Sequence, residues 1–453
     1  MLLESYNILN TNQDILDKYV SRFRFILIDE TQDMNHAQNE IIKLLGKPNN
    51  NVFIVNDPLQ NIYNWRGSDN KYVLKFHKDW DNVTVINLDT NYRSAKDIVV
   101  MSNKFASTIE VSKHEFYVES HTDAPYYKTP MLFTYKDEFD EADNIADQIN
   151  NFISAEQYSF KDFCVLARTN AQLQTFETSF YNKNIAYEIV DGNSFIERVE
   201  IKIVLSYLRL ANDVYDNESF EYIYYRPNRW LGKAFLEECK KAGDKSLFNS
   251  MEKAVRSNPR FRDGVEELKW IIGLLKKRTW DSVGEQIKCL RKNLDIDGYI
   301  SKDIQGDGNE SEKVENINSL EKIATRFKTL DDFLEYINKL SIKKNTDNNY
   351  VKLSTIHKSK GLEFPVVFLT GLNDTLLPHH RSDNIEEEKR LAYVAMTRAE
   401  KELYCSYVEI YQDKQLEPSP FIKNMFGNIF MCENNNLKKK QNRKNKNIHI
   451  RQT

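Results

Sequence analysis

The chain has 453 residues, which is enough for two or more domains that each bury a hydrophobic core. A formal net charge of −4 excludes a general attraction to nucleic acids, so any such contact must come from local basic patches. The cysteines lack a CxxC spacing, which argues against a disulfide framework or zinc site and for a reducing compartment. They are Cys164, Cys239, Cys289, Cys405 and Cys432. Because the sequence shows no signal peptide and no apolar run of membrane-spanning length, we expect a soluble, cytoplasmic protein.

Residues 1 to about 90 alternate between strand and helix patterns. The apolar run at 25–28 has no polar alternation, which predicts a strand buried on both faces of a parallel sheet. A helix is expected over 37–45, a second buried strand over 52–55 and a further strand over 83–86. This alternation predicts a parallel sheet with crossover helices.

The same mixture of patterns resumes from 91 to about 187, and then helical patterns dominate from 194 to 349. This change favours a helical insert between two α/β segments. The expected later elements are helices at 141–153, 201–210, 265–275 and 333–340, and strands at 163–166, 351–354, 365–369 and 403–408. The Asn- and Lys-rich segment 434–451 predicts a disordered basic tail.

The first strand ends in two adjacent carboxylates, Asp29 and Glu30. Ligands of open α/β sheets bind outside the carboxyl ends of the strands. Asp29 is suited to Mg²⁺, a hard cation that takes oxygen ligands, and Glu30 to orienting or deprotonating water in phosphoryl transfer. The alternative is that strands often end in Asp simply because turns prefer it.

The second strand runs into a loop at 56–67 that carries an amide, two aromatic rings and a cation. Gln60 lies near the same strand-end edge as Asp29, where an amide can contact a terminal phosphate. Tyr63, Trp65 and Arg66 combine the ring and cation chemistry of single-strand nucleic-acid binding. The alternative is that these aromatic residues only pack the loop down.

Two further stretches carry arginines, one at a domain junction and one at the end of a strand. Arg93 follows Tyr92 and can clamp a nucleotide with the ring on the base, or form a surface ion pair. Arg168 and Asn170 are candidate phosphate or sugar contacts, although Thr-Asn is also an ordinary helix N-cap.

The stretch 353–369 places a turn dense in hydrogen-bonding groups between two strands, and this turn either contacts ligands or is a solvated connection. The stretch 386–399 predicts a helix with Leu391, Val394 and Arg398 on one face. An arginine on an apolar face needs a partner, which is a transferred phosphate or a neighbouring Glu.

Together and in this order, these stretches resemble the UvrD/Rep/PcrA-like superfamily 1 DNA helicases over residues 1 to about 410. The resemblance rests on DETQD (motif II), NDPLQNIYNWRG (III), NYRS (IV), STIHKSKGLEF (V) and EEEKRLAYVAMTRAEKEL (VI). It implies an α/β fold of RecA-like parallel-sheet motor domains, the first one incomplete, with a mostly helical insert in the second. The implied domains are 1–90 (C-terminal part of the first motor domain), 91–193 and 350–410 (second motor domain), 194–349 (helical insert) and 411–453 (basic tail).

The resemblance also implies ATP and Mg²⁺ as cofactors, and roles for individual residues. Asp29 would bind Mg²⁺, Glu30 would be the catalytic base and Gln60 a γ-phosphate sensor. The other implied nucleotide contacts are Arg93 and Arg398 (γ-phosphate), Tyr92 (adenine) and Glu363 (ribose). The implied or candidate DNA contacts are Tyr63, Trp65, Arg66, Arg168, Asn170, His357, Arg229, Gly232 and Lys233, the last three in a turn that resembles the family's duplex-contacting turn.

The sequence departs from the family at the phosphate-binding loop, because none of its fourteen glycines begins a GxxxxGK[ST] motif. We therefore expect the C-terminal part of a 3′→5′ DNA helicase that needs a complementary N-terminal polypeptide for ATP hydrolysis, with exposed apolar surface around 25–28 and 52–55. Its expected partners are single-stranded DNA and single-strand/duplex junctions. The competing interpretation is a non-catalytic DNA-binding remnant or interaction module, and a helicase–nuclease subunit is less favoured.

Overall fold

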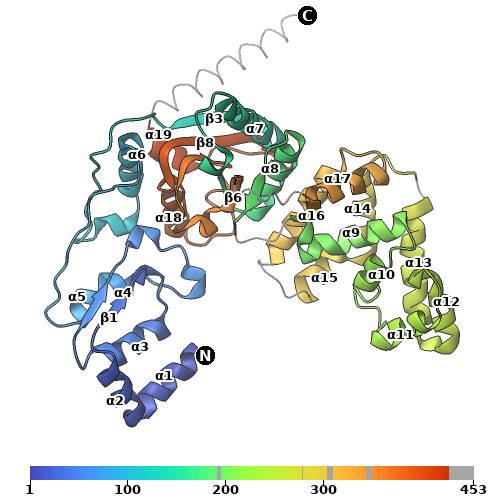
Figure 1. Ribbon diagram of the computed structural model, residues 1–453, viewed down its shortest axis with the longest axis horizontal. Coiled ribbons are helices and arrows are strands. Elements are labelled where there is room, and N and C mark those ends of the chain that lie inside the picture. Colours follow the sequence, from blue (N-terminus) through green and yellow to red (C-terminus); the bar gives the residue numbers. More distant parts are fainter. Residues whose placement is uncertain (191–194, 278, 304–309, 343–348, 428–453) are drawn as a thin grey trace, which may run out of the picture. The chain divides into compact units, whose positions relative to one another are not determined.

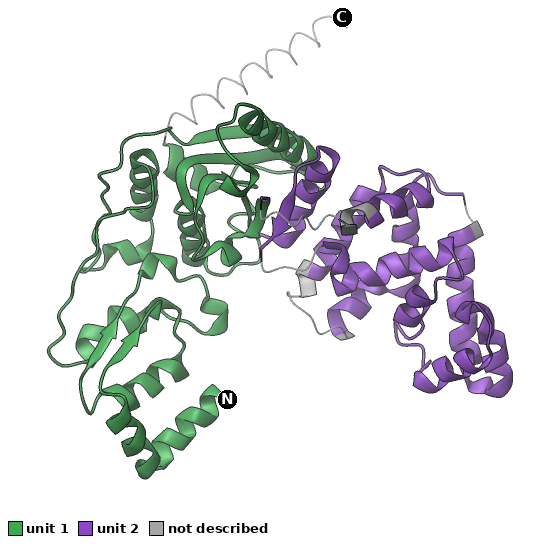
Figure 2. Ribbon diagram, in the orientation of Figure 1, with its two compact units in different colours: residues 1–168, 351–453 green, residues 169–350 purple. Residues whose placement is uncertain are grey.

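The computed structural model describes residues 1–190, 195–277, 279–303, 310–342 and 349–427 (Figure 1). The chain divides into two compact units, residues 1–168 with 351–453 and residues 169–350 (Figure 2). The predicted disordered segment 434–451 and the predicted boundary at 193/194 lie outside the described residues, whereas residues 411–427 of the predicted tail at 411–453 are described and include a helix at Pro420–Phe426 with Phe421 and Ile422 buried. No helix within these ranges is both long and apolar enough to cross a membrane.

The first part of unit 1 contains a small parallel sheet. Its two strands are β1 (Ile26–Ile28) and β2 (Val52–Ile54), and Leu27 lies opposite Phe53 in their register. The helices before and between them are α1 (Leu2–Thr11), α2 (Gln13–Arg22) and α3 (His36–Gly46). The expected parallel strands and the helix at 37–45 are confirmed.

Two expectations about this part are wrong. The strands are not buried on both faces, because Leu27 is 74% and Phe53 57% exposed. Residues 83–86 form no strand, and Ile86 is 72% exposed. An apolar run becomes a strand only where a neighbouring strand completes its hydrogen bonds, and no strand of the described chain pairs with this segment. The expected exposure of apolar residues near 25–28 and 52–55 is confirmed.

The larger sheet of unit 1 has the order β3-β8-β7-β4-β6, and all these neighbours are parallel. Its strands are β3 (Met131–Asp137), β4 (Phe163–Ala167), β6 (Val351–Thr355), β7 (Phe364–Leu369) and β8 (Ala399–Tyr411), and β9 (Lys414–Gln415) pairs antiparallel with β8. The predicted α/β class with parallel sheets is confirmed.

Helices cover both faces of this sheet because successive side chains of a strand point to opposite faces. Leu403, Cys405 and Tyr407 of β8 belong to a core shared with α6 and α18. Ser406, on the opposite face, donates to Glu141 of α7. The covering helices are α6 (Lys96–Ala106), α7 (Glu138–Ser154), α18 (Ile385–Met396) and α19 (Pro420–Phe426).

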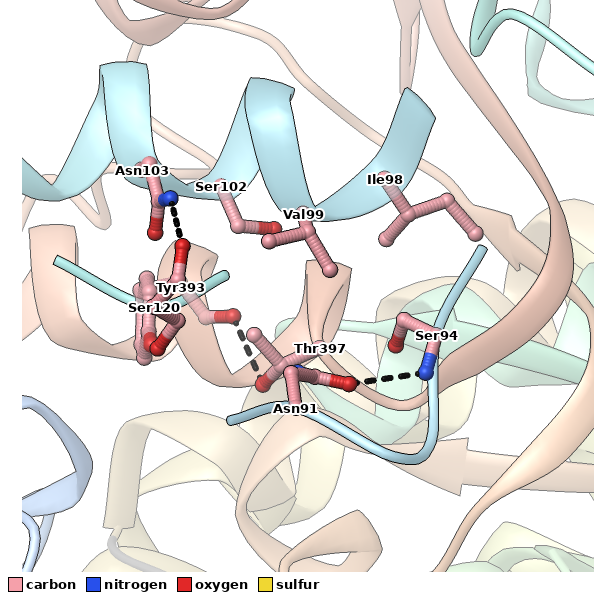
Figure 3. Close-up of a pocket in the computed structure, with 9 residues that line it drawn as sticks. All are labelled: Asn91, Ser94, Ile98, Val99, Ser102, Asn103, Ser120, Tyr393 and Thr397. Atoms are coloured by element: carbon pink, nitrogen blue, oxygen red, sulfur yellow. Dashed lines mark hydrogen bonds between the residues drawn. The ribbon is translucent and has the colours of Figure 1, made fainter. Parts of the chain in front are cut away.

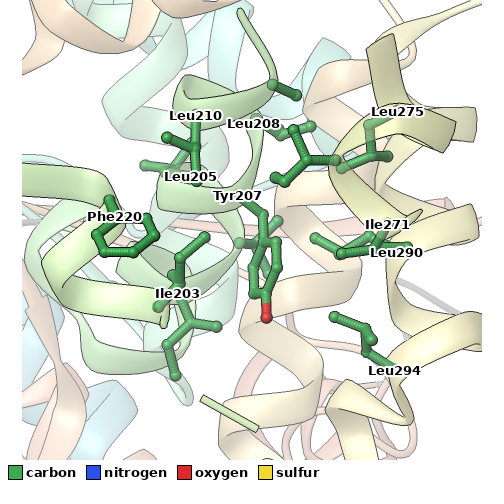
Figure 4. Packing of buried hydrophobic residues seen from close by; sticks show 14 of the residues in the cluster. Ile203, Leu205, Tyr207, Leu208, Leu210, Phe220, Ile271, Leu275, Leu290 and Leu294 are labelled. Atoms are coloured by element: carbon green, nitrogen blue, oxygen red, sulfur yellow. The ribbon is translucent and has the colours of Figure 1, made fainter. Parts of the chain in front are cut away.

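Unit 2 is mostly helical, as expected for 194–349. Its core gathers around α9, where Ile203, Tyr207 and Leu208 lie in one cluster with Ile271 and Leu290 (Figure 4). Its helices are α8 (Asn170–Asn182), α9 (Val199–Asn212), α10 (Asn217–Ile223), α11 (Lys233–Lys241), α12 (Leu247–Ser257), α13 (Arg262–Lys277), α14 (Val283–Leu294), α15 (Ile296–Asp303), α16 (Glu310–Ala324) and α17 (Leu330–Ile342). It also holds the short strand β5 (Tyr187–Ile189).

Short helices and 3₁₀ turns lie between these elements. Two four-residue helices, α4 (Lys71–Leu74) and α5 (Phe76–Asp79), follow the loop after β2. The 3₁₀ turns are η1 (Thr31–Asp33), η2 (Pro58–Gln60), η3 (Asn64–Arg66), η4 (Glu110–Lys113), η5 (Phe160–Asp162), η6 (Phe195–Glu197), η7 (Pro259–Phe261) and η8 (Ile356–Ser359).

Candidate active site

The acidic turn after β1 presents its two carboxylates at the surface. Asp29 and Glu30 are both exposed, and the Asp29 carboxylate accepts a hydrogen bond from the Glu30 backbone N–H at 2.8 Å. Glu30 has a φ of +49°, which is uncommon for a residue other than glycine. Gln32 donates to the Glu30 carboxylate at 2.5 Å. This amide fixes the side chain of an acid whose backbone is already constrained.

Lys360, from the turn after β6, joins the acidic turn to the loop after β2. Its Nζ lies 2.6 Å from Asp33 Oδ2 and 3.3 Å from Glu30 Oε2. It also donates to the backbone carbonyl of Gln60 at 2.8 Å. Burial raises the pKa of Asp33, and the hydrogen bond from Lys360 opposes that rise. The ammonium group therefore holds two acids and the Gln60 loop together.

Gln60 and Arg398 meet at this same place. The Gln60 amide donates to Asp57 at 2.8 Å, and its oxygen accepts from Arg398 Nη2 at 3.2 Å. Arg398 does not lie on the helix face that we predicted, because α18 ends at Met396 and the arginine follows that end. It is nevertheless 1% exposed, and burial lowers its pKa to about 10, so the side chain stays charged at neutral pH.

The partners of Arg398 are neutral oxygen atoms. Besides Gln60, its guanidinium donates to the carbonyls of Val394 and Leu362 and to the Thr397 hydroxyl. Among the described residues no carboxylate forms an ion pair with it, so the expected alternative of a neighbouring Glu is not what the structure contains. A buried cation with only neutral partners retains its attraction for an anion.

Arg93 lies beside the backbone that carries Arg398. Its Nε is 2.6 Å from Glu363 Oε2, and its Nη1 donates to the Thr397 carbonyl at 3.3 Å. Both partners of this ion pair are partly exposed, at 33% and 54%. Tyr92, the preceding residue, is 91% exposed. The expected surface ion pair of Arg93 is thus present, with the ring of Tyr92 open to solvent.

The turn that carries Arg93 is held in place by side-chain hydrogen bonds of Asn91 and Ser94. The Asn91 side chain accepts hydrogen bonds from the backbone N–H groups of Arg93 and Ser94, at 3.0 and 2.9 Å. The Ser94 hydroxyl donates to the Ala399 carbonyl at 2.7 Å. Figure 3 shows Asn91, Ser94 and Thr397 around a small cavity that is also lined by Ser102 and Tyr393. These contacts tie the Arg93 turn to the start of β8.

The aromatic residues of the loop after β2 divide into one packed and one exposed ring. Tyr63 is half-buried and donates to the His357 carbonyl at 3.2 Å, so the packing interpretation holds for it. Trp65 is 67% exposed. The Arg66 guanidinium lies 4.5 Å from the Trp65 ring centroid and 5.1 Å from that of Tyr63. A cation and an open indole are thus presented together.

His357 lies between this loop and β6. Its ring centroid is 6.4 Å from that of Tyr63, and burial lowers its pKa to about 3, so the imidazole is neutral at physiological pH. Lys360 Nζ lies 5.5 Å from the same Tyr63 ring. A path of contacts therefore leads from Trp65 through Arg66 and Tyr63 to the acidic turn.

Arg168 is engaged in an internal ion pair. Its Nη2 and Nε donate to the two carboxylate oxygens of Glu388 at 2.8 and 3.1 Å, and the Glu388 side chain is 1% exposed. Asn170 is the first residue of α8, after a capping box between Thr169 and Gln172. The N-cap pattern noted in the sequence is therefore present at Thr169.

The turn before α11 contains the three remaining candidates. The Arg229 side chain is 1% exposed and donates to the Tyr207 hydroxyl at 2.6 Å and the Ile223 carbonyl at 3.0 Å. Gly232 is the N-cap of α11 and Lys233 its first residue, and both are exposed. Arg229 therefore supports the turn from inside its unit, while Gly232 and Lys233 lie at the surface.

Two residues of the site were not singled out from the sequence. Lys360 and Asp33 belong to two of the motifs named above, but they are 327 positions apart in the sequence, so no local pattern predicts their contact. A lysine inside a loop of hydrogen-bonding residues is the only signal that the sequence offers for Lys360.

Parallel sheets, with acids after β1 and an amide after β2 beyond the carboxyl ends of these strands, are consistent with RecA-like motor domains. The sequence model of the UvrD-like helicase C-terminal domain matches residues 86–410, and that of the UvrD/REP helicase N-terminal domain matches residues 1–81. The chain belongs to the UvrD-like helicase family. The match at 1–81 gives no support to our expectation that the N-terminal part is missing.

Curated relatives agree with this assignment. The chain is 34% identical to the ATP-dependent DNA helicase Rep of Buchnera aphidicola subsp. Schizaphis graminum, over 92% of this chain and 67% of the relative. It is 32% identical to DNA helicase II of Rickettsia typhi, over 93% of this chain and 66% of the relative. It is 31% identical to the ATP-dependent DNA helicase PcrA of Staphylococcus aureus, over 90% and 58%. The chain thus spans about two thirds or less of the length of these relatives.

Proposed function

We propose that this chain carries the hydrolytic and DNA-contacting residues of an ATP-dependent 3′→5′ DNA helicase of the UvrD/Rep type. The observation that carries the proposal is the contact of Arg398 with Gln60, because it brings a buried cation beside the acidic turn. Its neutral partners leave that cation available to a phosphate. The helicase names of the relatives support the same activity.

In this proposal Asp29 helps to hold Mg²⁺ and Glu30 orients and deprotonates the attacking water. One carboxylate suffices for Mg²⁺ that is already held by phosphates, and the exposed Asp29 side chain fits that need. Magnesium nucleotide would supply the phosphoryl group and the metal that neutralises its charge. Gln60, Arg93 and Arg398 would stabilise the charge that develops on the γ-phosphate.

Tyr92 and Glu363 complete the proposed nucleotide contacts. The open ring of Tyr92 suits stacking on adenine, and the half-exposed carboxylate of Glu363 suits the ribose hydroxyls. Glu363 is paired with Arg93, so its use in ribose binding would require that ion pair to rearrange or to be shared.

Single-stranded DNA is the proposed substrate of the Trp65 loop. Trp65 offers a face for a base and Arg66 a charge for the backbone, while Tyr63 and His357 connect the loop to the acidic turn. Exposed Gly232 and Lys233 would contact the duplex of a junction, with Arg229 supporting their turn from inside. The internal contacts of Arg168 and the helix-start position of Asn170 favour positioning roles for both.

We further propose that ATP hydrolysis needs a phosphate-binding loop that this sequence does not contain. Backbone N–H groups and a lysine of such a loop cradle the phosphates, and their loss removes most of the ground-state binding. That loop would come from a polypeptide carrying it, joined to this chain or separate from it. The second candidate, a DNA-binding module without catalysis, is favoured by the absence of the motif itself.

The test is ATP hydrolysis by the 453-residue chain with and without single-stranded DNA, and with an added fragment that carries the phosphate-binding loop of a UvrD-like helicase. We expect no turnover alone and DNA-stimulated turnover with the fragment, abolished by Glu30→Gln. Turnover by the chain alone would refute the need for the loop. DNA binding without turnover in every mixture would favour the binding module.

A further inference from the structure

The strand β3 forms one edge of the larger sheet (Figure 1). It pairs with β8 along one side, and no strand of the described chain pairs with its other side. Natural sheets usually block such edges with a proline, a bulge or a very short strand. β3 has seven residues, contains no proline and keeps an unbroken register with β8 from Met131 to Tyr135. This edge is therefore open to a further strand.

The backbone groups on the open side belong to alternate residues of β3. The N–H of Lys136 donates to the Asp140 carboxylate of α7 at 3.0 Å, so it points away from β8. Because directions alternate along a strand, Leu132 and Thr134 present their backbone groups on the same open side. The Tyr135 hydroxyl contacts α7, so the neighbouring Lys136 side chain lies on the opposite face of the sheet. The available main-chain groups thus end where Asp140 caps Lys136.

A hollow of about 330 Å³ lies between β3, β8 and α7. The rings of Phe133, Phe152 and Tyr404 line it, together with the side chains of Met131 and Gln148. Because Met131 and Phe133 are two positions apart on β3, both belong to the face that meets α7. Strand addition to a sheet edge takes its affinity from main-chain hydrogen bonds and its specificity from pockets for alternate side chains. This hollow suits an aromatic side chain.

The end of the open edge is acidic. α7 carries acids at 138, 140, 141, 143 and 147 and contains no Lys or Arg. Among the described residues, the Asp140 carboxylate has only neutral donors, the Lys136 N–H and the Asn144 amide. Lys128, the cation beside the hollow, is already paired with Glu402 at 2.9 Å. The charges around the edge therefore attract a basic ligand and repel an acidic one.

We propose that the open edge of β3 binds an extended basic peptide of another protein, which adds to the sheet as a further strand and places an aromatic side chain in the hollow. Phe133 at the hollow and Lys136 at the acidic end are about 10 Å apart along the strand. Bases two and four positions from the aromatic residue therefore face the acids. The site contains none of the nucleotide or DNA contacts proposed above, so it does not depend on the proposed function.

The test titrates the full 453-residue chain with fluorescein-labelled peptides and follows their anisotropy. Two threonine-flanked probes carry Phe-Thr-Arg-Thr-Arg and the reverse order, since the peptide runs parallel or antiparallel to β3. We expect one order to bind. Replacing its Phe by Ser should raise the Kd about 10-fold or more, and replacing both Arg by Glu about 3-fold or more.

N-methylation identifies strand addition, because only alternate N–H groups of the peptide face β3. One control methylates the two threonines between the named residues, and another methylates the Phe and Arg residues. We expect one of these controls to lose binding and the other to keep it, although both have the charge of the unmodified probe. Equal affinity of all three peptides would overturn the proposal, since charge alone would then explain the binding.

Variants of the chain locate the site. Thr134→Pro removes an N–H from the open side, so it should raise the Kd about 10-fold or more with an unchanged Tm. Asp140→Asn should raise the Kd of the Arg probe about 3-fold, whereas Asp14→Asn, at an exposed position of α2, should not. If Thr134→Pro does not fold, the methylated probes and Asp140→Asn still decide. Full affinity in Asp140→Asn would overturn the proposal.

Hydrogen exchange and sedimentation distinguish other occupants of this edge. The bound probe should slow amide exchange over residues 131–136. A dimer of the free chain that the probe dissociates would assign the edge to a second copy and overturn the proposal. Binding that appears only after removal of residues 428–453 would assign the edge to this chain's own segment, which would also overturn it.

Discussion

The ammonium group of Lys360 lies 2.6 Å from the carboxylate of Asp33, although 327 positions separate the two residues. The Lys360 side chain is 8% exposed and that of Asp33 is 24% exposed. Removing one partner of a buried pair leaves a charge without compensation, which costs about 3 kcal/mol. We therefore expect Lys360→Met to lower the free energy of unfolding of unit 1 by about that amount, measured by urea denaturation.

The same pair provides its own control. Because Asp33→Asn removes the charge that Lys360→Met leaves unpaired, the double variant should be more stable than Lys360→Met alone. If the double variant lost as much stability as the two single variants together, the two groups would not interact energetically.

The sequence was sufficient to predict the long helices and the central strands. The helices predicted at 141–153, 201–210 and 265–275 are present, since a long helical pattern identifies a helix even where its predicted ends are a few residues off. The buried strands at 163–166 and 365–369 are present because their apolar runs meet other strands on both sides.

Other features depend on contacts that no local pattern encodes. Residues 83–86 have the composition of a strand but no partner in the described chain. Arg398 fits the period of α18, yet the helix ends two residues earlier and the arginine turns toward Gln60. Arg168 looked open to a ligand, and its pairing with Glu388 spans 220 positions. Local sequence thus identified these residue types but not the direction in which each side chain points.

The ion pair of Arg168 predicts a loss of stability larger than any loss of DNA affinity. Arg168→Met would leave the buried Glu388 carboxylate with the backbone N–H of His379, at 3.0 Å, as its remaining hydrogen-bond donor among the described residues. We expect about 3 kcal/mol lower stability of unit 1 and less than a 2-fold change in single-strand Kd. Glu388→Gln in the same chain should restore part of the stability. A Kd raised tenfold with unchanged stability would instead make Arg168 a direct DNA contact.

The open indole of Trp65 predicts a specific loss of single-strand binding. Stacking on one base contributes about 1–3 kcal/mol, so Trp65→Ala should raise the Kd for a single strand roughly 5-fold or more. The matched control is Tyr126→Ala, which removes another exposed ring of unit 1 that also lies near a lysine, at 5.1 Å from Lys96 Nζ. Equal losses in both variants would indicate non-specific binding rather than a contact at Trp65.

The buried carboxyl group of Glu141 in α7 should make the stability of unit 1 decrease as the pH rises. Burial raises its pKa to about 7, and its carboxyl accepts a hydrogen bond from Ser406 at 2.6 Å. Since the folded pKa exceeds the ordinary value of 4.5, this group's contribution to stability is complete below about 4.5 and is lost as the pH rises to about 7. Glu141→Gln should therefore raise the stability at pH 8 by up to about 3 kcal/mol and flatten that dependence. Asp147→Asn, at an exposed position of the same helix, should do neither.

His357 predicts the opposite dependence on the acid side. Burial lowers its pKa to about 3 from an ordinary 6.5, so the folded protein keeps the imidazole neutral while the unfolded chain binds a proton. The stability contributed by the neutral ring is complete above about pH 6.5 and falls as the pH drops toward 3, by at most about 1.4 kcal/mol per pH unit. His357→Asn should reduce that slope in Tm measurements between pH 6.5 and 4.5, whereas His36→Asn, at an exposed position, should leave it unchanged. An unchanged slope in His357→Asn would mean that the imidazole is protonated in the folded protein, and Tyr63 would then face a cation instead of a neutral ring.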